Sequence, residues 1–139
     1  MVDRTRVEER LRRLHVLLAE LNDLRALGRD RYLADTGTQL QVEHALQQTI
    51  QICIDVGAHL IAELGFETPT EYAEVFSVLA DHEAIDRDLA EQLMGSVGTR
   101  NAIVHAYLSL NRKRIWSDMD RLDDFINFAK AVEGRMDST

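Results

Sequence analysis

Apolar residues recur every three or four positions along several stretches of this chain, the spacing that places side chains on one face of an α-helix. The first stretch predicts a helix from about residue 3 to 27. The second predicts a helix that Thr36 or Thr38 caps and that ends at about Leu64, before Gly65. Their apolar seams are Val7, Leu11, Leu14, Leu18 and Leu21, and then Val42, Leu46, Ile50, Cys53, Gly57, Leu60 and Leu64.

The region between these helices and the interior of the second each carry a structural expectation. Residues 30–35 read as a short connection with Tyr32 and Leu33 packing down. Gly57 lies inside the apolar seam, where glycine costs about 1 kcal/mol relative to alanine. We therefore expect another helix to approach closely at Gly57.

Three further helices follow in the pattern. Thr68 to Glu71 combine a capping threonine with proline and glutamate, which predicts a short helix through about Ala80 with Tyr72, Phe76 and Leu79 inward. After a loop, Asp86 caps a helix with Leu89 and Leu93 in the core. Asn111 caps a last helix to about Val132, and residues 135–139 form a frayed tail. Its seam is Ile115, Met119, Leu122, Ile126 and Ala129, widened by Trp116, Phe125 and Phe128.

The predicted fold class is therefore all-α: an antiparallel up-and-down helical bundle of four to five main helices, forming one domain over residues 1–139. Apolar residues make up 45% and charged residues 29%, which is typical of a soluble globular protein. The single cysteine, Cys53, lies in an apolar run and suits a reducing, cytoplasmic setting. We expect no signal peptide, no membrane span, no metal site and no cofactor.

The formal net charge of −8 argues against a general nucleic-acid binder, because affinity for phosphate backbones comes mostly from lysine and arginine. The basic residues are not evenly spread, however, since Arg112, Lys113 and Arg114 follow one another. The acidic balance could equally serve a basic protein partner.

One polar group stands out just before this basic run, in the segment from Gly98 to Tyr107. At about 100° per residue, Asn101 and His105 share a helix face, and Arg100 and His105 differ by about 140°. Ala102, Ile103 and Ala106 fill the opposite, core-facing arc. Gly95 and Gly98 weaken the helix there, and a local bend would bring Arg100 and His105 closer together.

Arginine and histidine together can cleave RNA without a metal ion. The planar guanidinium of Arg100 suits a phosphate, and the imidazole of His105 can take and return a proton near neutral pH. The alternative is structural, with Arg100 in a surface ion pair and His105 satisfied in a core or an interface.

Asp55 and His59 form a second candidate pair one turn apart on the second helix. They are either a structural pair or candidate cleft residues that orient a substrate or His105. Their spacing does not separate these roles.

The spacing from Arg100 through four residues to His105 and Tyr107 resembles the R-x4-H-x-Y signature of HepT-like toxins, a branch of the HEPN ribonucleases. Asn101 and the Val97-Gly98 lead-in fit that group too, and the similarity extends to the Ile54–His59 run, the Glu-Leu-Gly segment and the Pro69-x-x-Tyr72 segment.

The resemblance implies the toxin of a toxin–antitoxin module: a metal-independent endoribonuclease with catalytic Arg100 and His105, supported by Asn101. It implies a homodimer whose motif helices meet around an RNA cleft, able to join a larger hetero-oligomer. It also implies a minimal nucleotidyltransferase antitoxin that neutralises the toxin by AMPylation of Tyr107. A plainer role for Tyr107 is to stack on a base.

Two other functions stay open from the sequence. Related bundles act as non-catalytic helical partners or substrate-binding subunits of a nucleotidyltransferase, and the acidic charge suits that role. A dimeric scaffold is also compatible with the apolar pattern. Toxicity of the chain expressed alone would separate the nuclease from both.

Overall fold

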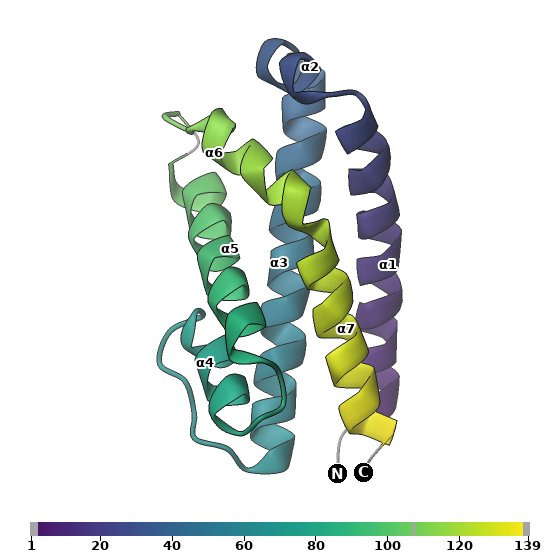
Figure 1. Ribbon diagram of the computed structural model, residues 1–139, viewed down its shortest axis with the longest axis vertical. Coiled ribbons are helices and arrows are strands. Elements are labelled where there is room, and N and C mark those ends of the chain that lie inside the picture. The colour runs from purple at the N-terminus through teal and green to yellow at the C-terminus, as the bar shows by residue number, and fades with distance from the viewer. Residues whose placement is uncertain (1–2, 107, 138–139) are drawn as a thin grey trace.

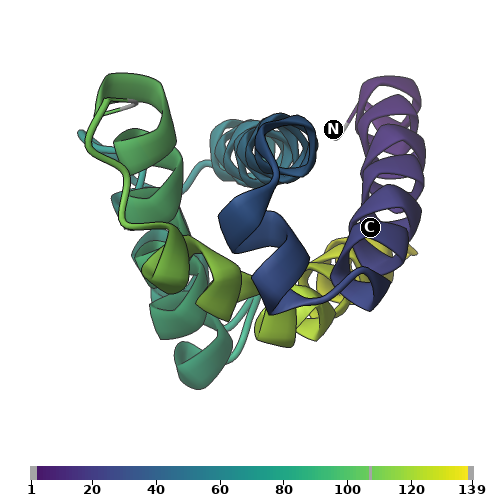
Figure 2. The ribbon, with the colours of Figure 1, turned by 90° about the horizontal axis from the view of Figure 1, so that it is seen from above.

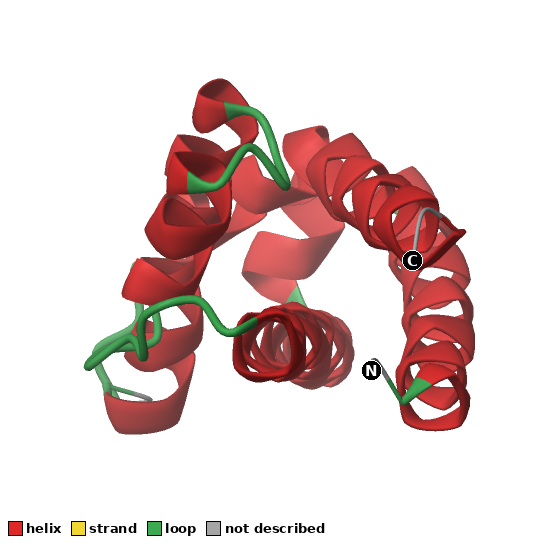
Figure 3. Cartoon of the chain, turned by 90° about the horizontal axis from the view of Figure 1, so that it is seen from below, coloured by secondary structure: helices red, strands yellow, loops and turns green. Residues whose placement is uncertain are grey.

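The computed structural model describes residues 3–106 and 108–137, and within them every regular element is helical (Figure 3). Four long helices alternate in direction: α1 (Arg4–Ala26), α3 (Thr36–Leu64), α5 (Arg87–His105) and α7 (Leu122–Asp137) (Figure 1). Short helices α2 (Arg29–Ala34), α4 (Glu74–Asp81) and α6 (Arg112–Ser117), with a 3₁₀ turn at Asp118–Arg121, lie between them. The predicted all-α, antiparallel up-and-down bundle is confirmed.

Helix α3 is the central element of the bundle. Seen along the bundle axis, it lies between α1 and α5, and α7 packs across one side (Figure 2). The predicted apolar seams supply the core. Side chains with almost no exposed surface come from every long helix and include Leu14, Leu21, Leu46, Ile50, Leu60, Leu79, Leu93, Phe125 and Phe128.

The close approach expected at Gly57 is confirmed. A Cβ built on Gly57 would lie 2.6 Å from Val75 Cγ1 and 3.2 Å from Leu79 Cδ1, both on α4. Glycine lets α4 pack directly on the α3 backbone, and this places the loop before α4 beside the middle of α3.

Several predicted boundaries were wrong, each because of a local hydrogen bond. Residues 30–35 were predicted as a connection, but residues 29–34 form α2. Asp35, instead of a threonine, caps α3: its Oδ2 accepts hydrogen bonds from the Thr38 backbone N–H at 2.9 Å and from the Thr38 hydroxyl at 2.7 Å. Gly65 ends α3 in the left-handed conformation, with φ of 74°, as expected.

The third helix begins later than predicted, at Glu74. The Thr70 backbone N–H donates to the Glu74 carboxylate at 3.0 Å, in the turn before the helix. Tyr72 consequently lies before the helix and is 48% exposed, whereas the sequence placed it in the core. Phe76 and Leu79 are buried as predicted.

The last predicted helix is interrupted and longer than expected. Asn111 caps it, with Asn111 Oδ1 accepting from the Arg114 N–H at 3.2 Å, but the 3₁₀ turn separates α6 from α7. The tail predicted to fray from Arg135 is helical to Asp137, where the last residues of α7 pack beside the start of α1. Residues 138–139 lie outside the described part.

A buried polar cluster ties α2 and α6 to α3. The Tyr32 hydroxyl donates to Glu43 Oε2 at 2.7 Å, and Arg112 Nε donates to the same oxygen at 2.8 Å. Arg112 NH2 also contacts Glu43 Oε1 at 3.3 Å, and the Tyr32 ring stacks on Trp116. Burial and the Glu43 carboxylate raise the pKa of Tyr32, so its hydroxyl stays a donor.

Two further expectations concern Cys53 and membranes. Cys53 is buried among apolar side chains, and burial raises the pKa of its thiol. None of the helices in the described ranges has the length and apolar character needed to cross a bilayer.

Candidate active site

The motif lies on the C-terminal half of α5, which is fixed by its buried face. Asp86 adopts an extended conformation at the start of α5, and Leu93, Val97 and Ile103 are buried below the motif. The helix ends at His105, where the Ala106 N–H donates to the Ala102 carbonyl at 2.8 Å. Ile103 is core-facing as predicted, whereas Ala102 and Ala106 are only half-buried.

Arg100 is held by side chains from three directions. Its Nε donates to Gln51 Oε1 of α3 at 3.1 Å, and its NH1 donates to Asn101 Oδ1 at 3.0 Å. The guanidinium carbon lies 5.0 Å from the centre of the Tyr72 ring. These partners are neutral, so within the described residues Arg100 is not in the surface ion pair that the sequence left open. Its positive charge remains available to an anion.

Asn101 and His105 lie one turn apart on the exposed surface of α5. Asn101 uses its side-chain oxygen to hold Arg100, which gives it a positioning contact beside the guanidinium. His105 is exposed at the C-terminus of α5 and is therefore not a histidine of the protomer's core. An imidazole in this position can reach a ligand from solvent.

Asp55 and His59 do not pair with each other. Asp55 Oδ1 accepts from Gln51 Nε2 at 2.9 Å, and Gln51 in turn holds Arg100. His59 Nε2 instead lies 3.9 Å from Glu63 Oε1 on the next turn of α3. Asp55 is therefore linked to Arg100 through the Gln51 side chain, whereas His59 contacts Glu63, which lies on α3 itself. Tyr107, the third signature residue, lies outside the described residues.

Two residues beside Arg100 were not recognised as site residues from the sequence. Gln51 stands one turn before Asp55 on the same face of α3, and this spacing was the available signal. Tyr72 was expected in the core, although it stands in the Pro69-x-x-Tyr72 segment. The cation–π contact depends on where the loop before α4 lies, which helix periodicity does not give.

The carboxyl group of Asp118, in the 3₁₀ turn before α7, is buried. Asp118 is 4% exposed, and its burial raises the pKa of its carboxyl group, an effect that Thr99 of α5 and Arg121 partly oppose. Its Oδ1 lies 3.6 Å from Arg121 NH2, while its buried Oδ2 has no hydrogen-bond partner. Thr99 is itself buried directly before Arg100.

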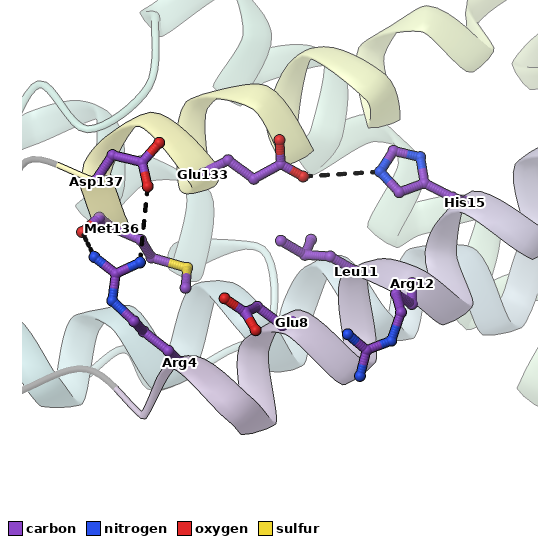
Figure 4. A pocket seen from close by; sticks show the side chains of 8 residues that line it. All are labelled: Arg4, Glu8, Leu11, Arg12, His15, Glu133, Met136 and Asp137. Carbon is purple, nitrogen blue, oxygen red and sulfur yellow. Dashed lines mark hydrogen bonds and ion pairs between the residues drawn. The ribbon is translucent and has the colours of Figure 1, made fainter.

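A different pocket, of about 320 Å³, lies between α1 and α7 and is drawn in Figure 4. Arg4 contacts the Met136 carbonyl and lies 3.7 Å from Asp137, and His15 Nε2 lies 3.8 Å from Glu133 Oε1. Arg4 and His15 on α1 thus face the Asp137 and Glu133 carboxylates of α7 across the pocket. Arg100, Asn101 and His105 do not line it, so we assign it to the contact between the two terminal helices.

Known proteins resemble this chain over most of its length. Residues 9–132 match the family model described as Ribonuclease HepT-like. A tRNA nuclease HepT from Aphanizomenon flos-aquae is 28% identical over 110 residues, which cover 79% of this chain and 75% of that protein. An mRNA nuclease HepT from Shewanella oneidensis is 25% identical over 118 residues, covering 78% and 89%.

Solved structures share the fold at lower identity. A tri-AMPylated Shewanella oneidensis HEPN toxin in complex with an MNT antitoxin superposes with a TM-score of 0.86 at 23% identity, covering 92% of this chain and 96% of that one. The cytosolic protein YutE from Bacillus subtilis gives a TM-score of 0.86 at 17% identity, covering 99% and 92%. The family model spans most of the chain, and the chain therefore belongs to the HepT-like ribonuclease family.

Proposed function

We propose that this chain is the toxin of a toxin–antitoxin module, and that it cleaves RNA endonucleolytically without a metal ion, through Arg100 and His105. The observation that carries the proposal is the state of Arg100: its guanidinium is oriented by Gln51, Asn101 and Tyr72, and no carboxylate of the described residues neutralises it. The nuclease names of two relatives and the family itself support it.

In the proposed reaction the ribose 2′-oxygen attacks the adjacent phosphorus, and the bond from phosphorus to the 5′-oxygen of the next nucleotide breaks. His105 takes the proton of the 2′-hydroxyl or delivers one to the leaving oxygen. Arg100 neutralises the charge that builds on the phosphorane. The products are a 2′,3′-cyclic phosphate and a 5′-hydroxyl end.

A homodimer completes the proposed site. Two motif helices meeting across a two-fold axis would place two copies of Arg100 and His105 at one cleft. The doubled positive charge would offset locally the net charge of −8, and one imidazole could act as base while the other acts as acid. Light scattering of the purified chain tests the dimer, and a monomer that cleaves RNA would contradict it.

Regulation by AMPylation is proposed for Tyr107. A nucleotidyltransferase antitoxin would join the phenol oxygen to the α-phosphorus of ATP and release pyrophosphate. The attached AMP adds bulk and negative charge two residues beyond His105, and this would exclude RNA by sterics and repulsion. The AMPylated toxin among the similar structures supports the idea. Mass spectrometry after co-expression with the neighbouring gene product tests it, and an adduct on another residue would contradict it.

The catalytic assignment is tested by RNA cleavage in EDTA. We expect wild type to cleave, and Arg100→Ala and His105→Ala to lose activity by about a hundredfold or more. Arg12→Ala and His15→Ala, which change exposed residues of the same types on α1, should cleave normally. Equal activity in all five proteins would remove Arg100 and His105 from the mechanism. A chain that is not toxic when expressed alone would favour a non-catalytic partner of a nucleotidyltransferase.

A further inference from the structure

A pocket of about 300 Å³ lies between α3 and the loop that precedes α4, and its lining includes Tyr72, whose ring Arg100 contacts. Its volume is at the lower end of the range of about 300–1,000 Å³ for small-molecule sites. Apolar side chains including Ile54, Ala58 and Val75 line it, together with the Tyr72 side chain. Two carboxylates, Asp55 and Glu71, also line it. Apolar walls with a few polar groups suit a flat, partly polar ligand.

Two residues connect this pocket to the arginine, Tyr72 by a direct contact and Asp55 through Gln51. Tyr72 lines the pocket, and its ring centre lies 5.0 Å from the Arg100 guanidinium carbon. Asp55 also lines the pocket, and it holds Gln51, which holds Arg100 Nε. A nucleotide whose phosphate binds Arg100 therefore has the pocket next to it. The two carboxylates repel a second phosphate, so the part of the nucleotide that enters is its base and not another phosphate.

We propose that this pocket receives the base of a nucleotide flanking the scissile phosphate, and that Asp55 selects guanine there. The inference rests on the proposed ribonuclease function and specifies its substrate. An ionised carboxylate only accepts hydrogen bonds. Guanine presents two adjacent donors, N1–H and the N2 amino group, which pair with the two oxygens of one carboxylate.

The other bases fit this acceptor less well. Adenine and cytosine each place a ring nitrogen acceptor beside their amino group, and that acceptor faces the second carboxylate oxygen. Uracil has one N–H between two carbonyl oxygens, both of which repel a carboxylate. Bases unstacked from single-stranded RNA are commonly read on this edge while they stack on an aromatic ring. Tyr72, which is 48% exposed at the pocket, provides that ring.

The test is to cleave a random-sequence RNA pool and sequence the new ends. Wild type should enrich guanine at one position next to the cleaved bond, by about tenfold. Asp55→Asn replaces one acceptor oxygen by a donor amide and should abolish that preference among the bonds that the variant cleaves. Asp23→Asn removes the same charge from an exposed position on α1 and should keep it. Circular dichroism confirms that the variants are folded.

A second arm measures binding without catalysis. His105→Ala should bind a short RNA with guanine at the selected position about tenfold more tightly than the inosine version, which lacks the N2 amino group. The ratio should fall to about one in the double variant Asp55→Asn/His105→Ala. We compare the ratio of the affinities for the guanine and inosine RNAs, and not the affinities themselves, because removing a negative charge strengthens the binding of any RNA.

The outcomes separate the two ideas. Cleavage without guanine enrichment, or the same enrichment in Asp55→Asn, overturns the base assignment and leaves the ribonuclease function intact. No cleavage by wild type overturns the ribonuclease function and the base assignment with it.

Discussion

Gly57 of α3 and Val75 of α4 lie so close that a Cβ added at Gly57 would come within 2.6 Å of Val75 Cγ1. Both residues are buried, and Leu79 also crowds the position. The contact holds α4 against the centre of the bundle. It thereby places the loop that carries Tyr72 beside Arg100.

Gly57→Ala should lower the free energy of unfolding by about 1–3 kcal/mol, because α4 must move away to admit the methyl group. This loss exceeds the gain of about 1 kcal/mol that alanine gives in a helix interior. Gly134→Ala on α7 is the control: a Cβ there meets nothing within 4 Å, so stability should stay the same or rise. Denaturant unfolding at equal protein concentration compares them, and equal stability would contradict the close approach.

Tyr72→Ala should slow RNA cleavage about two- to fivefold, because an exposed cation–π contact is worth about 0.5–1 kcal/mol. Tyr72→Phe keeps the ring and should cleave at nearly the wild-type rate. Neither change should alter the thermal midpoint much, since the side chain is 48% exposed. A large loss in Tyr72→Phe would mean that the hydroxyl group, and not the ring, supports the site.

Gln51→Leu should reduce kcat about threefold to tenfold, since Arg100 loses one oriented hydrogen bond worth about 1 kcal/mol. Gln51→Glu retains an acceptor oxygen but neutralises the Arg100 charge, so it should cleave no faster than Gln51→Leu, which a loss of orientation alone would not explain. Gln48→Leu, on the same helix, is the control. In an Arg100→Ala background the change at Gln51 should have no further effect. An undiminished effect there would show that Gln51 acts independently of the arginine.

Arg112→Met should destabilise the protein by about 3 kcal/mol, because it leaves the Glu43 carboxylate buried with only the Tyr32 hydroxyl as partner. The double variant Glu43→Leu/Arg112→Met removes both charges and should be more stable than the single variant. Denaturant unfolding of the wild type and both variants measures this order. A double variant less stable than the single one would contradict an unpaired charge as the cause.

Asp118 gives a prediction on pH. Its folded-state pKa lies above its ordinary value because the carboxyl group is buried. The native protein therefore binds this proton more tightly than the unfolded chain, and ionisation of Asp118 opposes folding as the pH rises. The free energy of unfolding of wild type, relative to that of Asp118→Asn, should be highest at about pH 3 and should fall as the pH rises toward neutral. A stability difference that does not change with pH would contradict the raised pKa.

The sequence predicted the long helices well, because each has enough apolar repeats to define a buried face. The Gly57 contact was also predictable, since a glycine inside an apolar seam weakens its helix and is best suited to a place where a neighbour needs the space. The ends of helices were less accurate. Asp35 and Thr36 are both good capping residues, and the choice between them depends on the turn made by α2.

The site was predicted as a set of residues but not as a set of contacts. Arg100, Asn101 and His105 come from one segment and all lie on α5, where Arg100 contacts Asn101. Gln51 and Tyr72 reach Arg100 from other elements, so their contacts depend on tertiary packing. Asp55 and His59 show the limit of spacing: they share a helix face, yet each contacts a different neighbour.

The fixed position of Arg100 has a thermodynamic consequence for RNA binding. An arginine without side-chain contacts on a helix surface samples many rotamers, and it loses this conformational entropy when it binds a phosphate. Here the clamp of Gln51, Asn101 and Tyr72 has already restricted the side chain during folding. In the proposed ribonuclease more of the energy of the guanidinium–phosphate contact would be left for the reaction, and a chain with a net negative charge would hold one phosphate without a broad basic surface.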